Sequence, residues 1–289
     1  MKWNLPVSRL ERRDLFYILK YAVLLMGAAF LFLGAEKTTV GADVNKAIKE
    51  AENLLLNQDR ILACTVLQRN LKKSLNKEEQ RVLREKLSAL SKVFFTDSGF
   101  EAFASGKDLF SKRKFPEAIE KFVESDESEK GNSDVLHYLT LSYLQSHKLA
   151  LAEGTNKSAL EINPVDIDLN RDNLDVLIKT EKWQAALLTS DLLLKNFADG
   201  SASSYEARGI AQLNLGLKSD AVKSFEQAIL KNPNSPEVYF LLSGLKEKPA
   251  STKLLAKYVE ICKGKEPARQ IREFSFCVNQ NEAEKKLAQ

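Results

Sequence analysis

One alanine recurs along this chain at a nearly constant interval, and that interval limits the possible folds more than any other feature. Ala118, Ala152, Ala186 and Ala221 end four similar five-residue segments and are separated by 34, 34 and 35 residues. A period of this length is typical of stacked units, each built from two helices that bury their apolar faces against their neighbours. A small residue is expected wherever two such helices cross closely. The spacing therefore predicts an all-helical repeat protein.

The unit Ala202–Ser235 shows the pattern most completely. Its positions 4, 8, 15, 20, 24, 27 and 32 are occupied by Tyr205, Gly209, Gly216, Ala221, Phe225, Ala228 and Pro233. These residues resemble the consensus of the tetratricopeptide repeat family. Gly209 and Ala221 are small where the paired helices cross, Gly216 suits the turn between them, and Pro233 ends the second helix.

The resemblance covers roughly residues 99–263, and it implies a right-handed α-solenoid of helical hairpins. The other units are Gly99–Asn132, Ser133–Asp166, a degenerate unit Ile167–Ser201, and one that begins at Pro236. In this last unit Leu254 stands where alanine is expected, as suits an atypical end repeat. Residues 264–289 are then expected to form a capping helix and tail.

Residues 36–98 are predicted to be helical and could include further degenerate repeats. Leucine, isoleucine and valine recur at helical spacing, and breaks near Asn57 and Ser74 divide the segment into about three helices. Asn76 followed by Glu78 and Glu79 predicts a helix start, because an amide can cap the first turn and acids favour it. No glycine-rich phosphate loop occurs.

The segment Leu15–Ala35 is predicted to be a single transmembrane signal anchor that precedes the solenoid. Its 21 residues contain one charge, Lys20, and a helix of this length spans about 31 Å, which matches a bilayer core. One alternative is a secretory signal peptide that is cleaved after Ala35, although Leu33 is large for such a site. Another alternative is a buried core helix.

Basic residues before this segment predict the orientation of the chain. Residues 1–14 contain Lys2, Arg9, Arg12 and Arg13, and such a cluster favours a cytoplasmic tail. The protein is then expected in the inner (cytoplasmic) membrane as a single-pass protein. Its C-terminal domain would be periplasmic or extracellular.

Composition argues against several classes of ligand. A net charge of +4 is too small for a nucleic-acid protein. Two histidines and no Cys-x-x-Cys pair argue against a metal site, and we expect no cofactor and no small-molecule substrate. Cys64, Cys262 and Cys277 cannot all pair within one chain. Cys262 and Cys277 could pair in an oxidising compartment, but partly buried thiols on helices are the favoured interpretation.

The family resemblance implies a concave groove, lined by the first helix of each repeat, that holds a protein or peptide partner. Its exposed positions fall on Phe103, Lys107, His137, Gln145, Arg171, Asp175, Glu206, Asn214 and Phe240. The Lys and Asn clamp with which some family members grip a free carboxyl terminus is missing. Any of these residues could equally be ordinary solvated surface. His137 has no acid or nucleophile nearby in the sequence, and the acidic run Glu124–Glu129 is interpreted as a solvated helix end.

Three functions are compatible with these features. A membrane-tethered scaffold that binds other proteins, and not an enzyme, agrees best with stacked repeats and their long surface. An obligate structural subunit of an envelope assembly, secretion or motility complex is the alternative. A catalytic site in residues 41–95 is disfavoured, because that region has no histidine and only Cys64.

Overall fold

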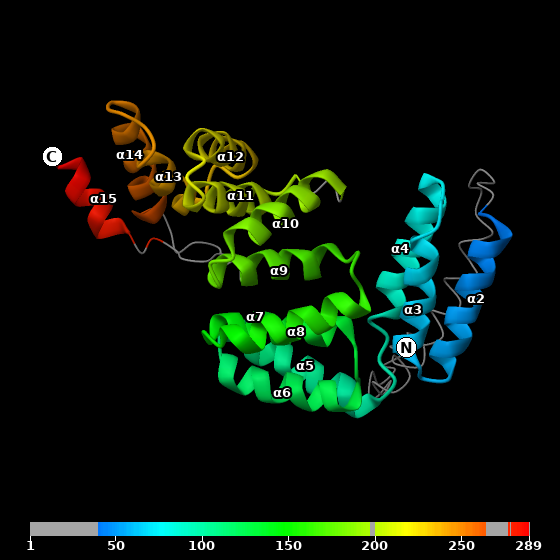
Figure 1. Ribbon diagram of the computed structural model, residues 1–289. Coiled ribbons are helices and arrows are strands. Elements are labelled where there is room, and N and C mark those ends of the chain that lie inside the picture. Colours follow the sequence, from blue (N-terminus) through cyan, green and yellow to red (C-terminus); the bar gives the residue numbers. More distant parts are fainter. Residues whose placement is uncertain (1–39, 197–199, 264–276, 278, 289) are drawn as a thin grey trace, which may run out of the picture. The chain divides into compact units, whose positions relative to one another are not determined.

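The protein is all-helical in the part that the computed structural model describes, which is residues 40–196, 200–263, 277 and 279–288 (Figure 1). This part contains fourteen α-helices and no strand. The chain divides into two units, Met1–Gly41 and Ala42–Gln289, and all fourteen helices belong to the second. The anchor predicted at residues 15–35 lies outside the described residues. None of the described helices is long and apolar enough to cross a bilayer.

Three helices precede the repeats, as the breaks in the sequence predict. They are α2 (Ala42–Leu56), α3 (Arg60–Leu71) and α4 (Lys77–Leu90). Asn76 caps α4: its side chain accepts a hydrogen bond from the Glu79 amide at 2.9 Å, and the Glu79 carboxylate accepts one from the Asn76 amide at 3.0 Å. This reciprocal capping satisfies two amides of the first turn, so the predicted helix start is confirmed.

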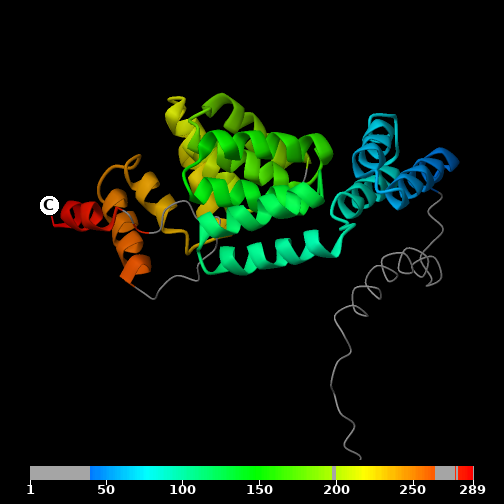
Figure 2. The same cartoon turned by 90° about the horizontal axis from the view of Figure 1, so that it is seen from below.

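Five helical hairpins follow in chain order, and each packs against the next (Figures 1 and 2). They are α5 (Asp97–Ser111) with α6 (Phe115–Ser128), α7 (Ser133–Gln145) with α8 (Leu149–Ile162), α9 (Ile167–Lys179) with α10 (Trp183–Asn196), α11 (Ala202–Asn214) with α12 (Lys218–Lys231), and α13 (Pro236–Ser243) with α14 (Ala250–Lys263). A last helix, α15 (Gln280–Leu287), packs on α14.

The recurring alanines lie where the helices cross. Ala118, Ala152, Ala186 and Ala221 are each the fourth residue of a second helix, and each is fully buried. The glycine of position 8 meets the phenylalanine of position 24 at the same crossing. A β-carbon on Gly209 would lie 2.5 Å from the Phe225 ring. These contacts confirm the reason inferred for the small residues.

The turn inside each of the first four hairpins uses one backbone conformation. Its position 15 has a positive φ in every case: 60° at Arg113, 55° at His147, 58° at Glu181 and 79° at Gly216. Only Gly216 avoids the steric cost that an L-residue bears in this region. His147 is exposed in its turn.

A disulfide joins Cys262 in α14 to Cys277, just before α15. The favoured interpretation of these two cysteines as unpaired thiols is therefore wrong. Spacing alone could not reveal the pairing, because it depends on the chain returning to α14 after 15 residues. The third cysteine, Cys64, is a free thiol and is buried.

The acidic run Glu124–Glu129 is not wholly a solvated helix end, because Glu129 is fully buried. Its carboxylate lies 2.7 Å from the Arg60 guanidinium. Arg60 also donates to the carbonyls of Glu129 and Lys130, at 2.9 and 2.6 Å. The sequence interpretation failed at Glu129 because its partner is 69 residues away. This pair joins α3 to the turn between α6 and α7.

Candidate partner-binding face

A row of side chains crosses the first helices of the repeats. The fifth residues of the five units are Phe103, His137, Arg171, Glu206 and Phe240. Helices α5, α7, α9 and α11 pack side by side in that order, so their equivalent positions follow one another in space. We call the surface of Lys107, His137, Gln145, Arg171, Asp175, Glu206 and Asn214 the first-helix face.

His137 is held by an acid from the next repeat. Its Nδ1 lies 2.5 Å from Oδ2 of Asp172, whose side chain is fully buried on α9. The Tyr138 ring meets the imidazole edge-on, with centroids 5.0 Å apart. A neutral imidazole with its proton on Nδ1 can donate this bond, and the bond fixes the orientation of the ring. His137 is therefore a positioned side chain of the face.

Charges of both signs alternate along α9. Arg171 lies 3.3 Å from the Asp168 carboxylate. Lys179 is half-buried, and this burial lowers the pKa of its ammonium group, while the Asp175 carboxylate acts in the opposite direction. Because two cations and two carboxylates share one helix face, the surface can distinguish partners by their charge pattern.

Neighbouring elements extend this polar surface. The Glu206 carboxylate accepts a hydrogen bond from the Ser235 hydroxyl at 3.2 Å. The Lys92 ammonium lies 3.3 Å from Asp134 and 3.2 Å from Asp166, at the starts of α7 and α9. Several carboxylates near the face are thus already engaged by groups of the same chain, which keeps them in fixed positions.

The predicted groove residues differ in their exposure. Lys107, Gln145 and Asn214 are exposed, while the side chains at His137, Arg171, Asp175, Glu206 and Phe240 are half-buried. The Asn214 side chain donates to the Ile210 carbonyl of its own helix at 2.9 Å. The structure brings the residues of α7, α9 and α11 together on one packed layer of helices.

Phe103 is not an exposed groove residue, and that part of the prediction is wrong. It is 6% exposed, because its ring packs among the rings of Phe94, Phe122 and Tyr138 at centroid distances of 5.1 to 5.9 Å. The Lys107 ammonium lies 5.4 Å from the Phe103 ring centroid and 5.1 Å from that of Tyr138. Lys107 therefore presents a charge above an aromatic cluster.

Phe240 lies near the end of the stack and is partly covered. The Lys286 ammonium of α15 is 5.2 Å from its ring centroid, and the Tyr258 ring is 5.4 Å away. Sequence reasoning could not place α15 there, because the contact depends on how the chain returns after α14.

Asp172, Lys92 and Lys179 were not predicted as part of this surface. A signal for Asp172 was present: it follows His137 by 35 residues, which is about one repeat, and this spacing could have placed the two on neighbouring first helices. Lys92 offers no such signal, because it precedes the first repeat.

No model of a known protein family matches the sequence, and no curated protein matches it. Solved structures match the fold. A double mutant of MamA RS-1 shares 15% identity over 57% of this chain and 95% of its own, with a TM-score of 0.51. The structure of MamA residues 41-end from Desulfovibrio magneticus RS-1 shares 14% identity over 57% of this chain and 94% of its own, with a TM-score of 0.50. TTC0263, a thermophilic TPR protein of Thermus thermophilus, shares 14% identity over 66% of this chain and 97% of its own, with a TM-score of 0.48.

The chain has a tetratricopeptide-type fold. The likeness confirms the fold that the alanine spacing and the seven consensus residues of Ala202–Ser235 implied. At such low identity the comparison carries the fold alone.

Proposed function

We propose that this protein is a membrane-tethered scaffold whose first-helix face binds a segment of a partner protein. The observation that carries the proposal is the row His137, Arg171 and Glu206. These residues occupy the same position of three adjacent first helices, yet they differ in chemistry. A partner that lies across the helices would meet each in turn, so the row can select a sequence.

The charges of the face indicate what such a partner should offer. Lys107 and Arg171 can pair with acidic groups of the partner, while Asp175 and Glu206 can pair with basic ones. Charges in complementary positions give specificity and register, more than affinity alone. The hydrogen bond that Asp172 accepts from His137 and the one that Ser235 donates to Glu206 hold His137 and Glu206 in place, which reduces the entropy lost on binding.

The tether and the location of the domain are part of the same proposal. Residues 15–35 are apolar apart from Lys20, and four basic residues precede them. The Cys262–Cys277 disulfide supports a position outside the cytoplasm, because disulfides persist in oxidising compartments. The domain would then act in the periplasm or outside the cell, attached to the inner membrane by one helix.

An obligate structural role is a second candidate, and one observation favours it. Leu188 and Leu192 lie one turn apart on α10 and are 71% and 40% exposed. Exposed apolar side chains that neighbour each other are typical of protein contacts. The isolated protein in lipid nanodiscs separates the two candidates. Self-association of the wild type that is abolished by Leu188→Glu would support the structural role. A monodisperse wild-type protein would favour the scaffold.

Site-specific photocrosslinking tests the binding face. p-Benzoylphenylalanine placed at Gln145 or Asn214 of the full-length protein in its own membrane should crosslink one partner, whereas the same group at Gln184, an exposed residue of α10, should not. Equal crosslinking at both surfaces would contradict the proposal. The purified partner should then bind the Arg171→Glu variant roughly tenfold more weakly, a loss of about 1.4 kcal/mol. Lys218→Glu, an exposed change outside the face, is the matched control.

A further inference from the structure

The fifth hairpin is built differently from the other four, and the difference opens a cleft. Helix α13 has 8 residues, whereas α7, α9 and α11 have 13 each. Near the place where the second helices of the four preceding hairpins have a buried alanine, α14 has two bulky residues, the half-buried Leu254 and the buried Leu255. Helices cannot cross as closely over these side chains as over alanine.

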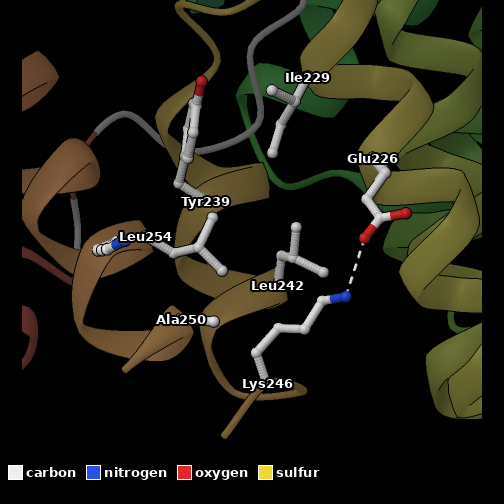
Figure 3. A pocket seen from close by; sticks show the side chains of 8 residues that line it. Glu226, Ile229, Tyr239, Leu242, Lys246, Ala250 and Leu254 are labelled. Carbon is white, nitrogen blue, oxygen red and sulfur yellow. Dashed lines mark hydrogen bonds and ion pairs between the residues drawn. The ribbon is translucent and has the colours of Figure 1, made fainter. Parts of the chain in front are cut away.

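The cleft has a volume of about 410 Å³ and lies among α12, α13 and α14. Figure 3 shows Ile229, Leu242 and Leu254 pointing into a shared space, with the Tyr239 ring beside them. Ala250 also contributes to the lining. This volume falls within the roughly 300 to 1,000 Å³ of ligand pockets, and an apolar lining with a few polar groups is typical of them.

The rim of the cleft carries two ammonium groups and one carboxylate. Lys246 and Glu226 form an ion pair at 2.8 Å across the opening. Lys253 is exposed and forms no ion pair within the described residues. With Glu226 compensated by Lys246, the rim retains one positive charge. A ligand with a carboxylate near its apolar part complements this arrangement.

An exposed leucine extends the apolar surface at one side of the cleft. Leu230 follows Glu226 by four residues on α12, so the two lie on neighbouring parts of one helix face. Leu230 is 70% exposed and is next to Ile229, which lines the cleft. A ligand with more than one apolar group could therefore cover the cleft and Leu230 together.

The cleft is separate from the first-helix face. On α13 the cleft residues are Tyr239 and Leu242, whereas the residue predicted for the groove is Phe240. At 3.6 residues per turn, Phe240 and Leu242 point in directions roughly 160° apart around the helix axis. One partner segment cannot occupy both positions of α13.

We propose that this cleft is a second binding site, and that it takes a peptide segment of a partner protein in which a leucine or phenylalanine lies within two residues of an aspartate or glutamate. The apolar side chain fills the space among Ile229, Leu242 and Leu254. The carboxylate pairs with Lys253. A repeat scaffold with two such sites can hold two segments at once, which raises overall avidity.

Peptide selection on the full-length protein in lipid nanodiscs tests the proposal. A displayed library with random residues should yield peptides with the apolar–acidic pattern. Their synthetic fluorescein-labelled forms should bind Ala250→Trp, which fills the cleft, and Lys253→Glu roughly tenfold more weakly than the wild type. Thr252→Trp and Lys218→Glu, exposed and outside the cleft, are the matched controls and should bind as the wild type does.

The remaining outcomes overturn the proposal. Selected peptides that lack an acidic residue, or that bind the cleft variants as well as the wild type, contradict it. The absence of any selected peptide also contradicts it. If a fluorescent fatty acid binds the wild type but not Ala250→Trp, the cleft takes a lipid in place of a peptide, and the proposal is again overturned. If Ala250→Trp fails to fold by circular dichroism, the exposed Lys253→Glu decides. Binding should persist in Arg171→Glu, so failure here leaves the proposal for the first-helix face untouched.

Discussion

Arg60 Nη2 lies 2.7 Å from Glu129 Oε2, and both side chains are almost completely buried. The Glu129 carboxylate also accepts hydrogen bonds from the amides of Phe95 and Thr96, at 3.0 and 2.7 Å, and from the Thr96 hydroxyl at 2.8 Å. The Arg60 guanidinium lies over the Phe95 ring, 4.4 Å from its centroid. One buried pair thus holds together α3, the start of α5 and the turn after α6.

Replacing Arg60 should therefore loosen the N-terminal helices from the repeats. Arg60→Met leaves the Glu129 carboxylate buried without its cation, which costs about 3 to 5 kcal/mol. Arg60→Lys keeps the charge but has fewer donors, so its cost should be smaller. Urea unfolding, followed by hydrogen exchange in α3, measures both. If Arg60→Met were as stable as the wild type, the pair would have no role in joining the two regions.

The contact between Gly209 and Phe225 predicts opposite results for two similar substitutions. Gly209→Ala places a methyl group 2.5 Å from a ring atom of the fully buried Phe225, and such overpacking costs about 1 to 3 kcal/mol. Gly154 lies exposed in α8 with nothing within 4 Å of an added β-carbon. Gly154→Ala should therefore stabilise the protein by about 0.5 to 1 kcal/mol. Thermal unfolding of the two variants decides; a loss of stability in both would contradict the packing argument.

The sequence predicted the hairpins because their rules are local and repeated. Ala118, Ala152, Ala186 and Ala221 report the same crossing four times, so chance is a poor explanation for the pattern. The breaks at Asn57 and Ser74 and the cap at Asn76 act within a few residues. Each of these signals depends on neighbours in the chain, which a single sequence shows.

The parts that sequence reasoning missed depend on residues that are distant in the chain. Glu129 was interpreted as solvated because its partner, Arg60, is 69 positions away. Phe103 was expected in the groove because its position is exposed in the family pattern. In this chain Phe94 and Tyr138 cover it, and the repeat spacing does not predict an aromatic cluster of that kind.

The interhelix turns offer a test of backbone strain. Gly216 has a φ of 79° and open space around it, so Gly216→Ala should cost about 1 kcal/mol through its backbone alone. His147 has a φ of 55° in the equivalent turn. His147→Gly removes the same backbone strain, but it also makes the unfolded chain more flexible. The variant should therefore be stabilised by the difference between these two effects. Chemical denaturation compares the pair, and equal effects of the same sign would contradict the prediction.

Glu237 should make stability depend on pH. Burial raises the pKa of its carboxyl group, and its Oε2 has no hydrogen-bond partner in the described part of the chain. The folded protein thus retains this proton to a higher pH than the unfolded chain does. The resulting stabilisation is complete below the unfolded pKa of about 4.3 and is lost as pH rises through the raised folded pKa.

Glu237→Gln removes this titration and should flatten the dependence. The variant should melt at a higher temperature than the wild type at pH 7, and the difference should shrink as the pH falls toward about 4. Glu247→Gln, at an exposed carboxyl group in the turn before α14, is the control. A difference that grows in acid would reverse the sign and contradict the burial of the Glu237 charge.

The three cysteines should react in two distinct ways. Burial raises the pKa of the Cys64 thiol to about 12, although the nearby Arg60 acts in the opposite direction. A thiol that is neutral and inaccessible reacts slowly, because the thiolate is the nucleophile. The folded protein should therefore resist maleimide at pH 7.

Without a reductant, the denatured chain should bind one equivalent, at Cys64, since Cys262 and Cys277 are paired. After reduction it should bind three, and mass spectrometry counts the additions. Three equivalents without a reductant would show that the disulfide is absent, and with it the support that it gives to a domain outside the cytoplasm.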